Sequence, residues 1–384
     1  MAARADHSIT MTFDLQTATE TVAQAAREHA TAVDANASFP AATIEAARSS
    51  GLLALTTATT HGGHGRSMRD AGAVIERVAR ECGSSAMVMT MHYAGNAVIE
   101  AYGRDDVRKD VAAGKHLSTL AFSEAGSRSH FWAPTSTAKA DGEHVTIDAD
   151  KSWITSANHA TAYVWSSRPS EGDEASTLWL VPGGADGLTI KGPFDGLGLR
   201  GNDSAPVQAR GVKIPTQNRL GDDGAGFGIM MQTVLPTFSM LISAGALGLA
   251  EALVTKTCEH VAGTNYAHMP EQNALRDLPT IRAYVARMRI QVDMAKALWQ
   301  STFDALEQGR EDAPLKVLET KAAAADTAAQ VADIAMRVCG GMAFRKEVGV
   351  ERMFRDTRAS LVMAPTSDQL YDFVGKAVTG LPLF

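Results

Sequence analysis

The most informative stretch of the chain lies near its C-terminus. It reads Val350-Glu351-Arg352-Met353-Phe354-Arg355-Asp356-Thr357-Arg358 and, after a short gap, Val362-Met363-Ala364-Pro365-Thr366-Ser367-Asp368. We expect the last three charged residues of the first segment to form an internal network of ion pairs. The Thr-Ser-Asp run that ends the second segment predicts the start of a last helix, over about 366–376. Ala364 stands just before that helix, and an alanine side chain cannot accept a proton.

The composition excludes several classes of protein. Of the 384 residues, 45% are hydrophobic and 21% are charged, which is typical of a soluble globular protein with a large core. The net charge of −7 gives no indication of nucleic-acid binding. No uninterrupted apolar run approaches the roughly 18 residues that span a bilayer, and the N-terminus lacks the apolar core of a signal peptide. The sequence therefore predicts a cytoplasmic protein without a membrane span.

The cysteines indicate the same compartment. Cys82, Cys258 and Cys339 are odd in number and lie far apart in the sequence. This spacing matches neither a disulfide framework nor a zinc site. We therefore expect reduced thiols and no metal.

Helical and β-rich patterns divide the chain into three parts. Apolar residues at helical spacing run through 17–33, 40–53, 70–80 and 86–102. Short β-rich runs separated by Gly, Pro and Asp turns follow, over 144–147, 161–166, 176–181 and 188–190. Long amphipathic stretches then cover 244–260, 278–308 and 316–336.

This order predicts an α+β fold that is mainly α. We expect an N-terminal helical domain over 1–115, a middle antiparallel β domain over 116–222 and a C-terminal helical bundle over 223–384. Alanine-rich runs such as 321–325 favour helix by propensity, and their small side chains suit close helix packing, within one chain or between subunits.

Several segments together resemble those of acyl-CoA dehydrogenases, over about 20–375. The segments are Ala121-Phe122-Ser123-Glu124-Ala125-Gly126-Ser127, Lys151-Ser152-Trp153-Ile154-Thr155-Ser156-Ala157, Gly196-Leu197-Gly198-Leu199-Arg200-Gly201-Asn202-Asp203-Ser204, the passage 212–227, and the C-terminal stretch with Gly340-Gly341 before it. Each segment alone is a weak signal, and their order and spacing make the resemblance specific. The resemblance implies the three-part fold and a flavin cofactor.

The resemblance also implies which residues of the β-rich part contact the flavin. An isoalloxazine ring needs a flat apolar wall, which Trp153 offers, and hydrogen bonds at its edge. Hydroxyl and backbone groups for those bonds come from Phe122, Ser123, Ser127 and Thr155. Gly126 would let the backbone approach the cofactor closely.

The residues that correspond to contacts of the cofactor's adenine side depart from the family pattern. The family's arginine-containing segment corresponds to 261–272, which holds no arginine, and a later glutamine corresponds to Pro279. Arg337 replaces another glutamine and could pair with a phosphate. Gly340, Gly341, Thr366 and Asp368 remain as implied flavin contacts. The cofactor expected is FAD, with FMN or transient reduced flavin as alternatives, and the resemblance implies a homotetramer or homodimer because FAD bridges subunits in this family.

The family's catalytic glutamate is missing. Its position holds Ala364, and the second position used by some members falls near Phe238. Neither side chain can remove the α-proton of a thioester. Three residues are candidates for catalysis: Asp368, which lies one helical turn after position 364; His92, which either faces the substrate cavity or is a satisfied core histidine; and Ser239, which replaces an arginine. Glu124 fits a structural role in its loop better than a catalytic role.

Three functional hypotheses follow. The first is a flavin-dependent oxidoreductase of the acyl-CoA dehydrogenase type, which acts on an acyl thioester or a similar small organic substrate through a displaced base and passes electrons to a partner protein. The second is a monooxygenase on the same fold, supplied with reduced flavin by a reductase, in which His92 or Ser239 lies near the flavin. The third is a non-redox acyl-thioester enzyme or a binding protein.

Overall fold

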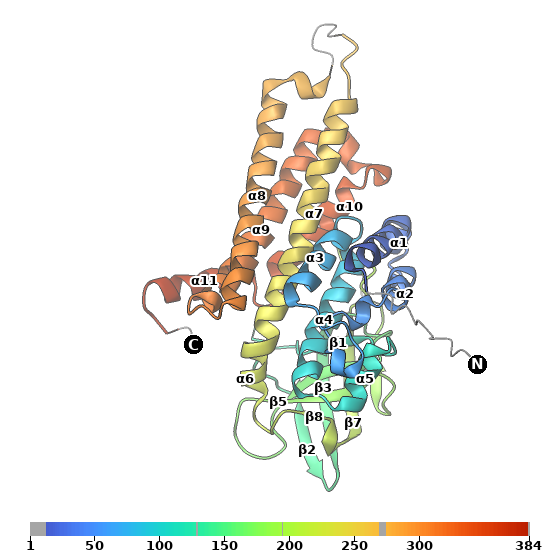
Figure 1. Ribbon diagram of the computed structural model, residues 1–384, viewed down its shortest axis with the longest axis vertical. Helices are drawn as coiled ribbons and strands as arrows, with labels where there is room; N and C mark the ends of the chain where they lie inside the picture. The colour runs from blue at the N-terminus through green and yellow to red at the C-terminus, as the bar shows by residue number, and fades with distance from the viewer. Residues whose placement is uncertain (1–12, 128–129, 194, 269–273, 383–384) are drawn as a thin grey trace, which may run out of the picture.

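The computed structural model describes residues 13–127, 130–193, 195–268 and 274–382, and they form three parts in the predicted order (Figure 1). The four helices α7–α10 stand together as a bundle. The N-terminal helices pack against the flank of α7, and the strands lie below them. The sequence-based expectation of a helical, a β and a second helical part is confirmed.

The N-terminal part consists of α1 (Leu15–Asn36), α2 (Ala41–Ser49), η1 (Leu52–Ala54), η2 (Thr59–His61), α3 (Met68–Ala79), α4 (Gly83–Tyr102) and α5 (Asp105–Ala112). Side-chain caps fix two of the helix starts: the Asp14 carboxylate accepts the backbone N–H of Gln16 and Thr17, and Ser67 and Asp70 form a capping box. Helix α4 is buried along nearly its whole length, because apolar and small residues occupy all its faces.

The middle part contains two four-stranded sheets. One has the order β1-β4-β5-β8 and the other β2-β3-β7-β6. The strands are β1 (Ser118–Ala121), β2 (Thr137–Asp141), β3 (His144–Ile154), β4 (Ala162–Ser167), β5 (Thr177–Pro182), β6 (Leu188–Ile190), β7 (Ala205–Pro215) and β8 (Arg219–Leu220). An apolar core that includes Trp165 and Trp179 holds the middle part together. The pairing of β1 with β4 is parallel, which corrects the expectation of a purely antiparallel domain.

The C-terminal part begins with a continuous helical rod made of α6 (Gly226–Ile229), the π-helical η4 (Met230–Val234) and α7 (Leu235–Gly263). The remaining elements are η5 (Leu275–Asp277), α8 (Pro279–Glu307), α9 (Ala313–Cys339), η6 (Gly340–Phe344), η7 (Lys346–Val348), α10 (Val350–Val362) and α11 (Ser367–Val378). In the middle part, η3 (Thr216–Asn218) connects β7 to β8. Helix α11 projects away from the bundle (Figure 1).

The rod from Gly226 to Gly263 is long and apolar enough to cross a membrane by length and composition alone. Scattered polar residues interrupt the apolar run, so the sequence alone did not predict a helix of this length and composition. In the folded chain 78% of the most apolar window is buried inside the protein. The apolar composition is therefore explained by its place at the centre of the bundle.

The expected ion-pair network around α10 is only partly correct. Arg355 pairs with Asp34 at 2.6 Å and with Glu351 at 2.7 Å, and Arg358 pairs with Asp333 at 2.7 Å. Asp356 makes no ion pair with any described residue. One of its oxygens instead accepts the backbone N–H of Leu199 at 2.6 Å. The two arginines therefore join α10 to α1 and to α9, and the Asp356 carboxyl lies buried beside them.

Candidate active site

Trp153 stands on the surface of the middle part as a strained, exposed tryptophan. It lies where the pairing of β3 with β7 shifts register between Lys151 and Ile154, and its φ is 61°. A bulky residue in this left-handed region is disfavoured by about 1–2 kcal/mol and marks sites with a function. The side chain is 64% exposed, whereas Lys151 and Ile154 on either side are buried. The fold thus presents one flat apolar ring at the end of a strand.

Polar groups at the ends of β1 and β3 accompany this ring. Thr155 is buried, and its hydroxyl lies 3.4 Å from the Ser204 hydroxyl. Ser127 donates its hydroxyl to the Glu124 carbonyl at 3.1 Å, so this hydroxyl supports its own loop. Gly126 has a φ of 96°, and a Cβ built on it would meet no atom within 4 Å. The open space at Gly126 allows a ligand to approach the backbone.

Glu124 belongs to the scaffold of this loop. Its carboxylate accepts the Lys151 ammonium at 2.5 Å and the Ser136 backbone N–H at 3.1 Å, and both charged side chains are buried. Burial opposes ionisation of Glu124, but Lys151 outweighs it and holds the pKa of Glu124 below its usual value. Burial lowers the pKa of Lys151 to about 8, although Glu124 opposes this. The pair ties the β1 end to β3, as expected for a structural residue.

The two positions at which the resemblance implies a base belong to a single apolar cluster. Phe238 and Ala364 pack, partly buried, against a set of buried side chains that includes Phe122 at the end of β1. Helix α4 contributes Met87, Met91, Ala94 and Val98 from one face, and α7 contributes Ile242. Phe122 directly precedes Ser123, whose carbonyl accepts the Ser152 N–H at 2.9 Å, so the segment before Trp153 is bonded to the end of β1 that reaches this cluster.

The candidate catalytic residues are not brought together. Asp368 is exposed in the first turn of α11, which Thr366 caps by accepting the Gln369 N–H at 3.3 Å. Ser239 is fully buried on α7, and its hydroxyl finds no hydrogen-bond partner among the described residues.

His92 has the geometry of a satisfied core histidine. It is fully buried, its Nε2 lies 2.7 Å from the Leu53 carbonyl, and its Nδ1 accepts the Ser118 N–H at 3.1 Å. Burial lowers the pKa of His92 to about 4, so the ring is neutral near pH 7. Both nitrogens are engaged in joining α4 to η1 and β1, which leaves neither for a substrate.

Lys321 is a site residue that the sequence reasoning missed. It is 2% exposed on α9, and its ammonium donates to the carbonyls of Met363 at 3.0 Å and Pro365 at 2.5 Å, on either side of Ala364. No described carboxylate pairs with it, and burial lowers the pKa of Lys321 to about 7. We call 363–366 the elbow, since it joins α10 to α11 and includes a cis Ala364–Pro365 peptide bond. The sequence holds one indication of this role. Lys321 is at helical spacing from the apolar positions Val317 and Ala328, so it lies on their buried face of α9.

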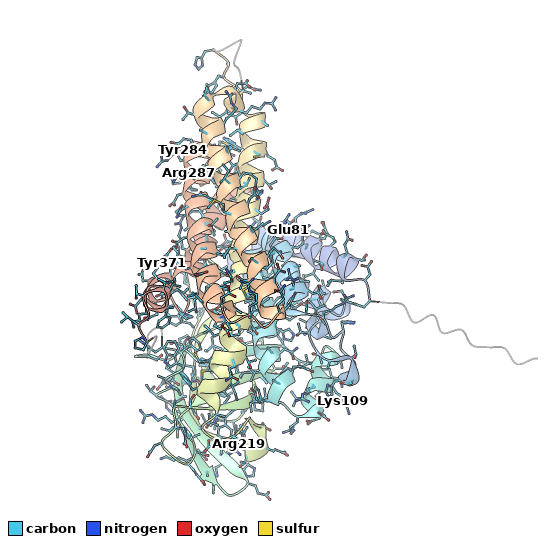
Figure 2. All side chains as sticks on the ribbon, turned by 60° about the vertical axis from the view of Figure 1, so that its left-hand side comes forward. Glu81, Lys109, Arg219, Tyr284, Arg287 and Tyr371 are labelled. Atoms are coloured by element: carbon cyan, nitrogen blue, oxygen red, sulfur yellow. The ribbon has the colours of Figure 1, made fainter. Side chains whose placement is uncertain are left out.

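The implied contacts for the adenine side lie elsewhere. Arg337 stacks over the Tyr284 ring at 5.7 Å and donates to its hydroxyl at 3.3 Å. Figure 2 places Tyr284 on the upper part of the bundle and Arg219 at the opposite, β-stranded end. Gly340 and Gly341 follow directly on α9 and are exposed. Arg337 therefore lies with Tyr284 on the upper part of the bundle, away from the β-stranded end of the chain.

Comparison with known proteins agrees with this architecture. Three family models match in order: the N-terminal domain of acyl-CoA dehydrogenases over 14–114, the middle domain over 119–212 and the C-terminal domain over 224–379. The chain belongs to the acyl-CoA dehydrogenase superfamily.

Individual relatives are distant. The short-chain specific acyl-CoA dehydrogenase of Bos taurus mitochondria is 29% identical over 346 residues, which are 88% of this chain and 82% of the relative. The structure of butyryl-CoA dehydrogenase from Megasphaera elsdenii superposes with a TM-score of 0.87 at 20% identity, over 96% of this chain and 100% of the other. A structure of PigA with FAD and proline gives a TM-score of 0.84 at 17% identity, over 97% and 99%.

The residues present fit the ring of an FAD better than its adenine end. Trp153 and the open backbone at Gly126 provide a wall and an approach, as a flavin ring requires. Arg337 offers a cation beside Tyr284, which Figure 2 places on the upper part of the bundle, and Gly340 and Gly341 offer an exposed backbone directly after α9.

Proposed function

We propose that this protein is a flavin-dependent oxidoreductase that uses FAD and acts on an acyl thioester or a similar small organic substrate. The observation that supports it most is the link through Phe122. The exposed, strained Trp153 stands at one end of the site and Ala364 at the other, and Phe122 packs in the same cluster as Ala364. Superfamily membership supports the same reaction class.

In this proposal the chain's own residues hold and orient the cofactor. Trp153 backs the flavin ring, and Ser123, Ser127 and Thr155 supply hydrogen bonds at its edge. Thr366 contacts the ring from the elbow. Arg337, Gly340 and Gly341 of a second copy hold the adenine side, so the enzyme is a homodimer or homotetramer. When bound, FAD supplies two-electron oxidation and reduction.

The fate of the substrate's α-proton separates two forms of the proposal. Dehydrogenation needs a proton acceptor over the α-carbon, and neither Phe238 nor Ala364 can be one. Asp368 remains the displaced base that we propose for a dehydrogenase, with electrons passed to a partner protein in the cytoplasm.

A monooxygenase is the second candidate, and the apolar lining favours it. Met87, Met91, Phe122 and Phe238 belong to the same apolar cluster as Ala364, and apolar side chains exclude water. Oxygen chemistry on a reduced flavin needs such exclusion and no α-proton base. A partner reductase would supply the reducing equivalents.

The deciding experiment is an anaerobic titration of the flavin-loaded protein. Acyl thioesters of increasing length are added while the visible absorbance of the oxidised flavin is followed, with Trp153→Ala as the control that lacks the ring wall. Bleaching without oxygen supports dehydrogenation. Oxygen-dependent product only after supply of reduced flavin supports the monooxygenase. No flavin bound and neither reaction would contradict both forms.

Asp368 is tested in the same experiment. Asp368→Asn should abolish bleaching while flavin stays bound if this carboxylate is the base. Loss of the flavin itself would assign Asp368 to cofactor binding and remove it as the base.

A further inference from the structure

A second pocket, which the candidate active site does not use, opens between α3, α4, the start of α7 and the loop before α3. These three helices pack against one another (Figure 1). The free volume of the pocket is ≈ 270 Å³. An apolar cavity of about 150 Å³ holds a benzene molecule, so this pocket has room for a ligand of roughly ten non-hydrogen atoms.

The pocket lies on a different face of α7 from the apolar cluster that contains Ala364. Thr237 and Leu241 line the pocket, whereas the residue after each of them, Phe238 and Ile242, belongs to the cluster. One residue is a step of about 100° round an α-helix. A ligand in the pocket would therefore touch α7 from another side than a substrate at the cluster.

Small side chains keep the pocket open above an apolar floor. Tyr93 and Ala97 line it from α4, four residues apart on one face, and Ala71 lines it from α3. Ala71 and Tyr93 are each 1% exposed, and Leu241 is fully buried. Tyr93 already donates its hydroxyl to the Leu52 carbonyl at 2.8 Å, so its ring is what remains for a ligand. The floor suits an apolar body.

Arg66 places an unpaired cation at the rim of the pocket. It is exposed, and its guanidinium has neither an ion pair nor a hydrogen bond among the described residues. Its backbone is held in place, because its N–H donates to the Leu55 carbonyl at 2.9 Å and the Gly65 N–H donates to the Thr57 carbonyl at 2.8 Å. These bonds anchor Arg66 beside Thr56. A guanidinium can bind a carboxylate through two parallel hydrogen bonds.

The other polar groups of the pocket also favour an anion. The Thr56 hydroxyl accepts the Asn96 amide at 3.0 Å, which leaves its own proton for a ligand. Glu100 is the one acid among the described lining residues, and its carboxylate is directed away from the open space. One of its oxygens accepts the Ala58 N–H at 3.2 Å, and the other is closed to solvent. Arg66 and Thr56 therefore both offer donors.

We propose that this pocket binds a small monocarboxylate with an apolar body. The carboxylate lies on Arg66 and Thr56, and the body lies on Tyr93, Ala97 and Leu241. This ligand is not the reacting group of the substrate, because the pocket and the cluster that contains Ala364 are on different faces of α7. The site goes beyond the proposed function, and its occupation does not require a redox step.

Three probes that share one ring test which charge the pocket selects. Phenylacetate, phenylacetamide and phenethylamine carry an anionic, a neutral and a cationic end. Their binding to the protein, with its flavin, is measured by ligand-observed NMR at pH 7.5. We expect phenylacetate to bind at least about tenfold more tightly than phenylacetamide, because charge-assisted hydrogen bonds are about twice as strong as neutral ones. Phenethylamine should bind most weakly.

The same titrations can overturn the proposal. Equal binding of phenylacetate and phenylacetamide, or no binding of phenylacetate, means that Arg66 holds no carboxylate. Tighter binding of phenethylamine means that Glu100, and not Arg66, sets the charge of the ligand. Binding is measured without turnover, so failure of the redox proposal does not affect this result.

Arg66→Gln is the variant that tests the guanidinium. The preference for phenylacetate over phenylacetamide should disappear, and folding should be unaffected because Arg66 is exposed and unpaired. Arg210→Gln removes the same charge from an exposed position on β7 and should keep the preference. A preference that persists in Arg66→Gln overturns the proposal.

Ala97→Leu tests whether the carboxylate binds in this pocket or elsewhere. The larger side chain fills part of the pocket, and we expect the affinity for phenylacetate to fall by at least about tenfold. Ala25→Leu makes the same change at another partly exposed alanine, on α1, and should leave the affinity unchanged. Undiminished affinity in Ala97→Leu would place the ligand outside the pocket and overturn the proposal.

Discussion

The candidate site has two walls of different chemistry. One is formed by the middle part, and the other, the helical wall, by the residues around Phe238 and Ala364. The middle part offers an exposed tryptophan, buried hydroxyls and an open glycine, all set by short motifs at the ends of β1 and β3. The helical wall offers apolar side chains, among them Phe238 and Ala364 at the two positions where the resemblance implies a base. Cofactor binding depends on many weak contacts, whereas proton removal depends on one carboxylate. The second property can therefore be lost while the first is kept.

The largest effect is expected from a carboxylate placed in the helical wall, because it would supply the proton acceptor that this wall lacks. Ala364→Glu places a proton acceptor at the position that the family uses, and we expect anaerobic flavin reduction by a short acyl thioester to accelerate by at least about 100-fold. Stopped-flow absorbance measures the rate. Ala364→Gln has the same size without the acceptor and should remain slow. Equal rates for the two variants would show that the helical wall differs in more than one group.

Lys321 stabilises the helical wall, because it bonds the chain on both sides of Ala364. Lys321→Met leaves the Met363 and Pro365 carbonyls without their donors, and we expect a loss of about 2–4 kcal/mol in the free energy of unfolding. Urea unfolding measures it.

The loss should also depend on pH. The pKa of Lys321 is about 7 in the folded chain and 10.5 in the reference state, so the unfolded chain binds more protons between these values. Wild-type stability from this group therefore rises with pH above 7, and the gap between wild type and Lys321→Met should widen from pH 7 to pH 9. A constant gap would mean that Lys321 does not titrate in this range.

Asp356 should give the opposite dependence. Its pKa is about 6 when folded and 3.8 in the reference state, so the folded chain binds more protons between about pH 4 and pH 6. Stability from this group therefore falls as pH rises through that window. Asp356→Asn has no carboxyl group to ionise, so it avoids this loss. Its free energy of unfolding at pH 7.5 should exceed that of the wild type by up to about 3 kcal/mol. Its advantage should shrink toward pH 4, as calorimetry at both pH values would reveal.

The smallest effect is expected on the other wall, at Trp153. Both Trp153→Ala and Trp153→Gly remove the ring and should weaken flavin binding. Glycine accepts a φ of 61° without the penalty that alanine retains, so the glycine variant should be more stable by about 1 kcal/mol. Thermal unfolding of the two flavin-free variants measures the difference. If alanine is the more stable, Trp153 is not held in a strained conformation.

Local patterns predicted the three-part fold, because helical periodicity and turn residues depend on near neighbours. These patterns did not predict the parallel pairing of β1 with β4, because a four-residue strand has no pattern that reveals its partner. Asp356 was expected to pair with the arginines beside it, but on a helix adjacent side chains point in different directions. Its true neighbours, Leu199 and Gly83, are distant in sequence.

The candidate catalytic residues show the same limit. His92 was a plausible site residue by type, and only the fold reveals that Leu53 and Ser118 occupy both of its nitrogens. Lys321 was read as part of an alanine-rich helix, because nothing near it in sequence indicates that it reaches the carbonyls around position 364. Side chains that act across helices are visible only once the helices are placed.

The place of Arg337 beside Tyr284, on the upper part of the bundle, has a consequence for how the protein would be handled. In the proposed assembly one chain holds the ring of the dinucleotide, and another copy holds its adenine end. Cofactor loading would then follow the law of mass action for the chains as well as for the flavin. Dilution would release FAD, while FMN, which lacks the adenine, would be retained equally well at every protein concentration.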